Sequence, residues 1–503
     1  MNKKIKITAI IASLTLITFL FASCSLNIGT SESTTNASDV STTASDALEA
    51  VLDESEVIVN DDGTNTITLN NTSVTVPSSV KADGTTITIT EGGEYTVTGT
   101  LTDGRIVVDS EDDVTIILDN ANITCSYSSP IYIYNAKTAT VYLKDGTENS
   151  LTDGTAYTYT DSYSSQADEE PNACIYSKDD LVIAGSGSLT VNANFNNGIT
   201  SKDTLKIESS ALTVNAKNNG INGKDNLTVK NATVTVTSGG DALRSTNDTD
   251  TSLGYIVIAS STLNITSGED GIQAETYLSS GSSTVNIKSG GGHSVTASDD
   301  TSSKGIKAGT DISIDSGTFV IDSSDDAIHA NNSITINDGT FTLTTGDDGI
   351  HADNQLTINA GTFTIDAHEG LEATVVTLNN GTVTINASDD GINAAQKVDS
   401  VTPTVEINGG DITINMGQGD TDAIDSNGNI AINGGTVNIT GQSPFDWDGT
   451  ATLNGGTVYV NGTQVTELTN QFGGEMGGGM MGGPGQGGSM GGQPGQGGPG
   501  FHG

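Results

Sequence analysis

The sequence is poor in basic residues, cysteine and aromatic residues. Lys and Arg number 18 against 62 Asp and Glu, which gives the 503-residue chain a formal net charge of −44. A field of that sign repels nucleic acid and anionic lipid, so we expect neither as a partner. The Cys and His residues have no metal-ligand spacing, and neither a nucleophilic triad nor a phosphate-binding loop is visible. Cys125 and Cys174 either form a bridge or are small buried hydrophobic residues, and the second interpretation is favoured.

Helical periodicity is also lacking, and Pro is scarce before residue 480. Short runs in which Ile, Val or Leu alternate with polar residues take the place of helices. Because these apolar residues recur at period 2 throughout, the chain does not have the pattern of a disordered acidic polymer. Asn and Gly are abundant, as expected for corners at which positive φ is required.

An acidic box followed by a small and an apolar residue repeats along the chain. The boxes Ser324–Ala330 and Gly346–Ala352 lie 22 residues apart. The small residue of successive boxes falls at Gly198, Gly220, Ala242, Gly271, Gly305, Ala327, Gly349, Gly370, Gly391 and Ala423. Six of these nine steps are 21 or 22 residues, and longer steps contain polar insertions such as Ser245–Gly254. A fixed period in the twenties with strand patterning predicts stacked coils.

The predicted fold is therefore all-β: a parallel β-helix with about 22 residues and three short strands per coil. The alternative is a flat multi-domain β protein built of similar hairpins. Within one repeat unit, the alternation of apolar and polar residues predicts which side chains point into the coil and which point outward. The inward residues are Ile350, Ala352, Leu356, Ile358, Phe363 and Ile365, and the outward ones are His351, Thr357 and Thr364.

The two ends of the chain differ from the repeats. The first six residues include three Lys, and an apolar run Ile7–Phe21 follows, as in a secretory signal. The segment Leu20–Cys24 resembles a bacterial lipobox, whose Cys is acylated after cleavage; an ordinary signal peptide is the alternative. We expect export and a lipid anchor at Cys24, on the outer face of a bacterial cytoplasmic membrane or the cell surface. The expected divisions are a signal peptide (1–23), a lipidated Cys with a Ser/Thr-rich tether (24–50), a β-helix (51–468) and a disordered Gly/Met/Pro/Gln-rich tail (469–503).

Tyrosines concentrate near the start of the repeats. Eight of the twelve lie between Tyr127 and Tyr176, and residues 147–172 lack a strand pattern, which predicts a long loop. Its rings are suited to stacking on sugars, or alternatively they cap the hydrophobic end of the first coils. The candidate stacking residues are Tyr157, Tyr159 and Tyr163.

Stacking would align the acidic boxes into a column. Adjacent coils lie about 4.8 Å apart, and carboxylates so close repel by roughly 1 kcal/mol per pair even in water. Hard oxygen ligands suit Ca²⁺, which is the predicted cofactor. Asx-type turns are the alternative, since Asn196–Asn197 and Asn218–Asn219 occupy the same phase. The predicted calcium ligands are Glu269, Asp270, Asp325, Asp326, Asp347, Asp348, Glu369, Asp389, Asp390, Asp420 and Asp422.

A second column is predicted one residue past the apolar position of each box. It consists of Thr200, Asn222, Arg244, Gln273, Lys307, His329, His351, Glu372, Asn393 and Asp425. A strip of polar groups along a solenoid fits an extended polymer, although it is also compatible with an ordinary solvated face. The candidate glycan-binding residues are Arg244, Gln273, Lys307, His329 and His351.

Several stretches resemble the carbohydrate-binding family of right-handed parallel β-helix proteins that is related to polysaccharide lyases. They are the repeated Asn/Asp-Gly-Ile boxes, Gly93–Leu101 with Asp103–Gly104, Asn149–Gly154 and Cys174–Leu181. The resemblance covers roughly Ile87–Thr440. It implies a calcium-bearing β-helix that binds plant-type polysaccharides such as cellulose and pectic acid, and it does not settle catalysis.

The predicted function is a membrane-anchored, calcium-binding and monomeric polysaccharide-binding protein. A calcium-dependent, pectate-type lyase is the first alternative, with Lys304, Lys307 or Arg244 as the base that removes a proton beside a uronate carboxylate. Such a base needs a lowered pKa, whereas neighbouring carboxylates raise the pKa of a lysine. The second alternative is a calcium-stabilised adhesin or scaffold without a glycan ligand.

Overall fold

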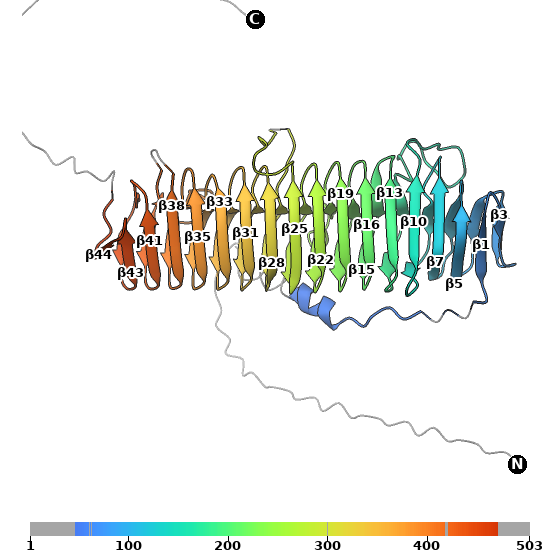
Figure 1. Cartoon of the computed structure of the whole chain (residues 1–503), viewed down its shortest axis with the longest axis horizontal. Helices are drawn as coiled ribbons and strands as arrows, with labels where there is room; N and C mark the ends of the chain where they lie inside the picture. The colour runs from blue at the N-terminus through green and yellow to red at the C-terminus, as the bar shows by residue number, and fades with distance from the viewer. Residues whose placement is uncertain (1–45, 60, 62, 299, 418–420, 471–503) are drawn as a thin grey trace, which may run out of the picture.

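Each coil consists of three short strands, and each strand hydrogen-bonds in parallel to its equivalents in the coils before and after it. The computed structural model describes residues 46–59, 61, 63–298, 300–417 and 421–470. Within them the strand pairings form three faces, A, B and C, along one elongated β-helix (Figure 1). The parallel β-helix prediction is confirmed, because residues one sequence period apart pair directly, as Ile328 does with Ile350.

Face A is turned toward the viewer in Figure 1. Its strands alternate buried apolar residues with polar residues that are exposed or half-buried, as in Thr340–Thr345. They are β1 (Thr66–Asn71), the second halves of β5 (Gly93–Leu101) and β7 (Val114–Cys125), β10 (Glu148–Asp153), β13 (Ser188–Ala193), β16 (Ala211–Ala216), β19 (Thr233–Ser238), β22 (Thr262–Ser267), β25 (Ser283–Ser289), β28 (Gly317–Ser323), β31 (Thr340–Thr345), β33 (Thr362–Ala367), β35 (Thr382–Ala387), β38 (Asp411–Met416), β41 (Thr436–Thr440) and β43 (Thr457–Val460).

Face B follows the acidic boxes, and most of its later strands are only three residues long. Its strands are β4 (Thr86–Ile89), β6 (Arg105–Asp109), β8 (Ile131–Asn135), β11 (Ala173–Ser177), β14 (Asn197–Ser201), β17 (Ile221–Gly223), β20 (Leu243–Arg244), β23 (Ile272–Ala274), β26 (Ile306–Ala308), β29 (Ile328–Ala330), the first halves of β32 (Ile350–Ile358) and β34 (Leu371–Leu378), β36 (Ile392–Ala394) and β39 (Ile424–Ser426).

Face C closes each coil. Its strands are the first halves of β5 and β7, β9 (Ala139–Leu143), β12 (Leu181–Ala184), β15 (Thr204–Glu208), β18 (Asn226–Lys230), β21 (Tyr255–Ala259), β24 (Leu278–Gly281), β27 (Asp311–Ile314), β30 (Ser333–Ile336), the second halves of β32 and β34, β37 (Thr404–Ile407), β40 (Asn429–Ile432) and β42 (Ala451–Leu453). Antiparallel pairs with β2 (Val74–Thr75), β3 (Val80–Asp83) and β44 (Thr463–Val465) lie at the two ends of the helix.

The core consists of ladders of like residues. All six residues predicted to point inward in the Gly349 unit are fully buried. Phe319, Phe341 and Phe363 stack with nearly parallel rings, at centroid distances of 4.9 and 4.6 Å. The glycine at most of the boxes is also explained. At Gly349 an added Cβ would lie 2.5 Å from the carbonyl oxygen of Gly370, so the corner has room for little more than a hydrogen atom.

The predicted loop at residues 147–172 begins too early, because β10 occupies Glu148–Asp153. This strand has one apolar residue, Leu151, and therefore shows little alternation. Its interior is completed by polar groups: the Asn149 side chain accepts from the Ala121 N–H and donates to the Ser188 carbonyl. Hydrogen bonds to neighbouring coils thus replace apolar contacts.

A short helix at residues 46–53 was not expected from the sequence. Leu48 and Val51 pack against Val257 and Ala259 of β21, so the end of the predicted tether lies against face C. The Lys230 ammonium donates to the Glu54 carbonyl at 2.6 Å, just past the C-terminal end of this helix, where a cation is favourable. The amphipathic segment is too short to have stood out next to the Ser/Thr-rich stretch before it.

Cys125 and Cys174 are free and buried, which confirms the favoured interpretation. Burial raises the pKa of the Cys125 thiol to about 11. The predicted signal peptide, the lipidation site Cys24, most of the predicted tail and the predicted calcium ligand Asp420 lie outside the described residues. Among those residues, we find no helix with the length and apolarity needed to cross a membrane.

The phenylalanine ladder provides a test of coil packing. Phe341→Ala removes the middle ring, and we expect the free energy of unfolding to fall by about 3–5 kcal/mol. Thr342→Ala, at an exposed position of the same strand, should change it by about 0.5 kcal/mol or less. Urea titration gives both values, and hydrogen exchange of β28, β31 and β33 locates the effect. Equal losses in the two variants would show that the ladder is not the stabilising element.

Candidate functional site

The predicted polar column exists on face B with the predicted register. Strand pairing places Arg244 beside Gln273, Gln273 beside Lys307, and Lys307 beside His329. His329 is followed by His351, and the column continues to Glu372, Asn393 and Asp425. Its members are half-buried or buried, with Thr200 and Glu372 only 3% and 5% exposed. The column is therefore recessed and does not form a fully solvated strip.

The aspartates beside this column have a structural role. The Asp326 side chain accepts the N–H of Asp348 at 3.1 Å, and the Asp241 side chain accepts the N–H of Asp270, also at 3.1 Å. Asn197 and Asn219 make the same bond in earlier coils. The alternative of Asx-type turn residues thus accounts for one oxygen of each side chain, with the bond running to the next coil.

From Asp241 to Asp326, cationic side chains occupy the other carboxylate oxygens. Arg244 lies 3.1 Å from Asp241, and Lys307 lies 3.7 Å from Asp270. The Lys304 ammonium donates to both Asp325, at 2.6 Å, and Asp326, at 2.8 Å. In these coils the protein supplies the counter-charges that calcium was predicted to provide.

These pairings also bear on the lyase alternative. Burial lowers the pKa of Lys304, but Asp326 and Asp325 outweigh it and raise the pKa above its usual value. A lysine held in this way stays protonated and is a poor general base. Arg244, another candidate base, is held in its ion pair with Asp241.

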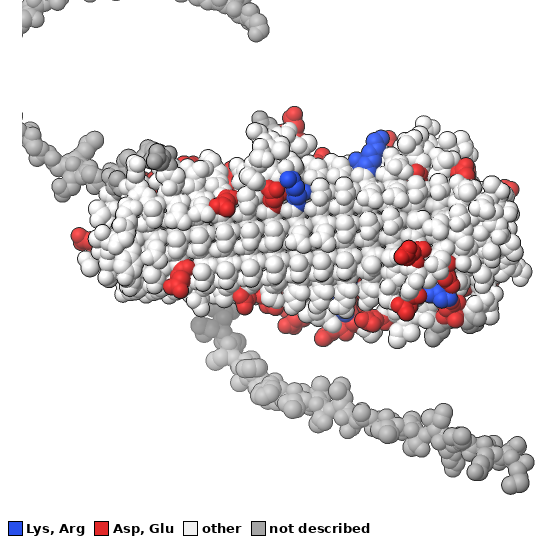
Figure 2. Space-filling view, in the orientation of Figure 1, with Lys and Arg blue, Asp and Glu red and all other residues white. Residues whose placement is uncertain are grey.

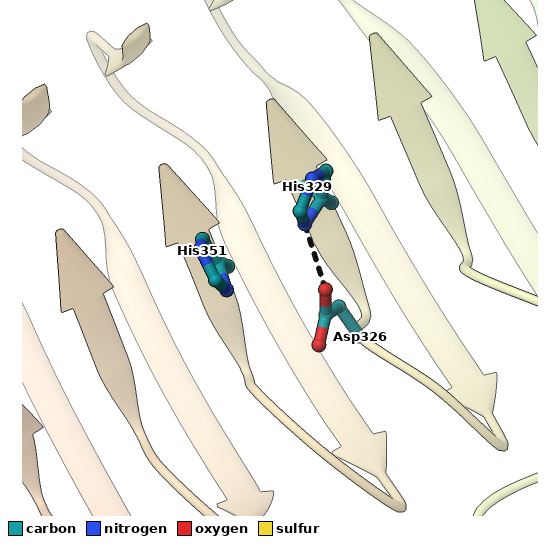
Figure 3. Close-up of side chains that lie close together, drawn as sticks. All are labelled: Asp326, His329 and His351. Carbon is teal, nitrogen blue, oxygen red and sulfur yellow. Dashed lines mark hydrogen bonds and ion pairs between the residues drawn. The ribbon is translucent and has the colours of Figure 1, made fainter. Parts of the chain in front are cut away.

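Two histidines continue the pairing in the next coils (Figure 3). His329 Nδ1 lies 2.8 Å from Asp326, and His351 Nδ1 lies 2.8 Å from Asp348 and 3.1 Å from Glu372. Burial disfavours charge on His351, but the hydrogen bond to Asp348 and the charge of Glu372 outweigh it and raise the pKa to about 9. Lys397 pairs with the other oxygen of Glu372 at 2.9 Å.

The later coils hold acids that lack this neutralisation. Among the described residues, no ion pair joins Glu369, Asp390 or Asp425 to a Lys or Arg. Burial, reinforced by neighbouring carboxylates, raises the pKa of Glu369 to about 8, of Asp390 to about 6 and of Asp425 to about 7. The ligand atoms of His368, Glu369 and Asp389 lie within 4.8 Å of one another. A hard cation fits this cluster better than the coils of Asp270 and Asp326, where lysines already lie.

A cavity of about 310 Å³ opens beside the column, between Gln273 and Lys307 on one side and Asp300–Ser302 on the other. Glu269 and Asp270 also line it. Two of the predicted glycan-binding residues therefore face a hollow of roughly one sugar unit, which the insertion between β25 and β26 bounds.

The tyrosine-rich loop is held mainly by internal contacts. Tyr157 is buried, its ring stacks on Phe195 at 4.2 Å, and its hydroxyl donates to Asp153 at 2.7 Å. Tyr163 packs edge-on against Tyr134 at 5.1 Å. The ring of Tyr157 is therefore packed beneath its own loop and is not presented to a ligand. Tyr159 is half-buried, with its hydroxyl 3.3 Å from the Pro171 carbonyl.

Face A carries a surface that the candidate residues did not include. Its outward residues align in register as rows of Thr and Asn, and Figure 2 shows charged side chains mainly near its margins and its N-terminal end. We call these rows the threonine face; one contains Thr318, Thr340, Thr362 and Thr382, and the next Thr342, Thr364, Thr384 and Thr413. The repeated Gly-Thr-Phe-Thr of residues 339–342 and 361–364 was the sequence signal for it.

The raised pKa of Glu369 gives a test of the unneutralised cluster. Between about pH 5 and pH 8 the folded state binds this proton more tightly than the unfolded state does, so the free energy of unfolding falls as pH rises. In chelator at pH 8, Glu369→Gln should raise the melting temperature by about 2–4 °C and flatten the pH profile. Asp366→Asn, at an exposed position on face A, is the control. Superimposable profiles for the wild type and Glu369→Gln would contradict the assignment.

Comparison with known proteins identifies the family. The model of the carbohydrate-binding domain-containing protein family matches residues 83–349 and 347–467. A carbohydrate-binding domain-containing protein of Acetivibrio thermocellus is 48% identical over 132 residues, which are 26% of this chain and 45% of that protein. This chain thus spans less than half of that curated relative.

A solved structure, described as the polysaccharide lyase-like protein from C. thermocellum in a gadolinium derivative, is 36% identical to this chain. The match covers 45% of this chain and 91% of that one, with a TM-score of 0.43. Because the family model extends over well over half of the sequence, the chain belongs to the carbohydrate-binding domain-containing protein family.

Proposed function

We propose that this protein is exported, anchored by a lipid at Cys24, and binds plant-type polysaccharide as a calcium-containing monomer. Family membership supports carbohydrate binding, and the signal sequence and lipobox support the anchor. We expect the polymer that contacts the threonine face to be neutral and extended, as cellulose is. An acidic polymer such as pectic acid would instead use the face B column, with calcium between the two sets of carboxylates.

The observation that carries this proposal is how little charge the threonine face holds in a chain of net charge −44. The row from Thr235 through Thr342 to Asn438 has no charged residue, and the row beside it has Asp411 next to Thr382. Hydroxyl groups repeat about every 4.8 Å between coils and about every 6.6–6.8 Å along each strand. Thr340, Thr342, Thr362 and Thr364 are exposed. Such an array presents donors and acceptors to a flat, neutral polymer surface without the cost of desolvating charge.

Face B is less suited to direct contact with sugar hydroxyls. Its polar groups are recessed. Arg244 and His351 are already paired with carboxylates of their own coils, and Lys307 is paired with Asp270 of the preceding coil. The cavity beside Gln273 is large enough for one unit of a chain. A uronate polymer would be repelled by the net charge of the protein unless cations intervened.

Charged substitutions test the threonine face. Thr342→Arg with Thr364→Arg places two long cations in adjacent coils of one row, and we expect retention on insoluble cellulose to fall at least about tenfold, since about 1.4 kcal/mol of binding free energy corresponds to tenfold. Thr335→Arg with Thr357→Arg makes the equivalent change on face C and should leave retention within about twofold. Pull-down of the full chain measures both.

Three other outcomes would redirect the assignment. Equal retention of both double variants would move the contact away from face A. Release of an unsaturated uronate from pectic acid, followed by its ultraviolet absorbance and lost in Lys307→Ala, would make the protein a lyase. Retention of neither polymer by the wild type would favour the scaffold alternative.

The calcium part of the proposal rests on Glu369, Asp390, Asp422 and Asp425. Oxygen ligands at these positions suit Ca²⁺, whose charge would offset both the burial and the repulsion that raise the pKa of Glu369, Asp390 and Asp425. These residues would hold the ion and thereby fix the later coils, and an ion with open coordination positions would also accept a uronate oxygen.

Calcium should therefore stabilise the folded chain. An ion at 100 times its dissociation constant contributes about 2.7 kcal/mol, and Asp390→Asn with Asp425→Asn should abolish the rise in melting temperature. Asp366→Asn with Asp411→Asn, two exposed acids of face A, should retain it. Calorimetry with and without chelator decides, and a wild-type melting temperature that is independent of chelator would refute calcium binding.

A further inference from the structure

Three lysines occupy the same position in three consecutive coils, at the corner that follows face B. Lys178, Lys202 and Lys224 come directly after β11, β14 and β17. The N–H of Lys202 donates to the Ser177 carbonyl and that of Lys224 to the Ser201 carbonyl, both at 3.0 Å, so the three coils are in register. We call these residues the lysine row. Such a row is unexpected in a chain with 18 basic residues, because like charges in adjacent coils repel each other.

Glu170, from the tyrosine-rich loop, supplies the counter-charge for the first two lysines. Its Oε2 lies 3.2 Å from the Lys178 ammonium and its Oε1 lies 3.0 Å from the Lys202 ammonium. Burial raises the pKa of Glu170, but Tyr176, Lys202 and Lys178 outweigh it and hold the pKa below its usual value. Two adjacent lysines of the row therefore stabilise an ionised carboxylate between them.

The next pair of the row, Lys202 and Lys224, has no such carboxylate from the chain itself. Among the described residues, no ion pair joins Lys224 to an acid. The Lys202 side chain is 46% exposed, and Lys224 is half-buried. An ammonium group has three donors, so Lys202 can contact Glu170 and a second carboxylate at the same time.

Polar groups in the same two coils also lack partners. Thr200 and Asn222 lie two residues before Lys202 and Lys224. The Thr200 hydroxyl and the Asn222 side-chain oxygen are buried, and neither has a hydrogen-bond partner among the described residues. Tyr176, the equivalent residue of the preceding coil, helps to hold Glu170. Because buried polar groups are normally hydrogen-bonded, the two unpartnered groups indicate a place where a ligand or its water would supply donors.

We propose that Lys202, Lys224 and Asn222 form a binding site for an acidic sugar unit of the uronate class, without calcium. The uronate carboxylate would lie between the two ammonium groups, as the Glu170 carboxylate does one coil earlier, in charge-assisted hydrogen bonds. The ring hydroxyls beside it would serve Asn222 and Thr200. The inference rests on the carbohydrate binding of the proposed function, and it adds a site for acidic polymers in the N-terminal half of face B.

An aspartate follows each lysine and limits the attraction for anions. The Asp179 side chain accepts the N–H of Ala136 at 2.9 Å, and that of Asp225 accepts the Asn247 amide at 2.7 Å. Burial, reinforced by Asp225, raises the pKa of Asp203. Since charge alone is partly balanced at this corner, the site favours a ligand that also offers hydroxyl groups over a simple anion.

Calorimetric titration of the full chain with a galacturonate trimer, in chelator, tests the site. We expect the trimer to bind, and Lys224→Gln to weaken it at least about tenfold, which corresponds to about 1.4 kcal/mol. Lys224→Arg keeps the charge and should retain most of the affinity. Lys217→Gln is the matched control, because it removes an exposed lysine from the corner that precedes β17 in the same coil, and it should change the affinity by less than about twofold. A glutamate trimer, which has carboxylates without sugar hydroxyls, should bind at least about tenfold more weakly.

Three results would overturn the proposal: no binding of the galacturonate trimer in chelator, equal losses in Lys224→Gln and Lys217→Gln, or equal affinity for the glutamate trimer. The melting temperature of each variant shows whether the fold is kept. Retention of the same samples on insoluble cellulose separates this inference from the proposed function. Wild-type protein that is retained on cellulose but does not bind the trimer refutes the lysine site alone, whereas a wild type that binds neither refutes both.

Discussion

The distance between stacked strands, about 4.8 Å, is the constraint on which the rest of this structure depends. It places every side chain directly beside its equivalent in the next coil, so that each position has a neighbour of the same kind. Such contacts are favourable for flat rings, as in Phe319, Phe341 and Phe363, and for amides, as where Asn359 donates to Asn337 at 2.9 Å. For carboxylates the same distance is unfavourable, and the chain has 62 acids to accommodate.

The structure meets this difficulty in two ways along one column. One oxygen of Asp326 accepts a backbone N–H of the next coil, which satisfies part of its negative charge without any cation. The other oxygen contacts Lys304 and His329, and these partners hold the pKa of Asp326 below its usual value although burial raises it. Glu369 and Asp390 form no ion pair with a lysine or arginine of the described residues, and their pKa values rise instead. Protons and external cations are therefore alternatives in those coils.

The sequence was sufficient to predict what depends on period and alternation. The coil length, the inward set around Ile350 and the register of the column from Arg244 to Asp425 follow from counting residues. It was not sufficient where side chains find partners in other coils. Lys304 was a candidate base, whereas the structure pairs it with Asp325 and Asp326. Tyr157 was a candidate ligand contact, yet it stacks on Phe195, a residue 38 positions later in the sequence. The pairing of Tyr157 depends on how an insertion folds back over the coils, which no periodicity encodes. Lys304, by contrast, lies 22 residues before Asp326, so the repeat itself places these two side chains next to each other.

The distribution of charge over the three faces of the β-helix affects how the protein can bind a polymer. Were the charge spread evenly, every face would repel acidic polymers and would hold a shell of counter-ions that a neutral polymer must displace. Instead, the acids of the repeats concentrate beside face B, where neighbouring lysines and histidines compensate many of them. The threonine face is left mainly with hydroxyl and amide groups at one regular spacing, with Asp411 and Val320 as exceptions. Because both arrangements arise from one 22-residue unit, adding coils lengthens the neutral surface and the acidic column together, and the proposed contact with a polymer would grow with the number of coils.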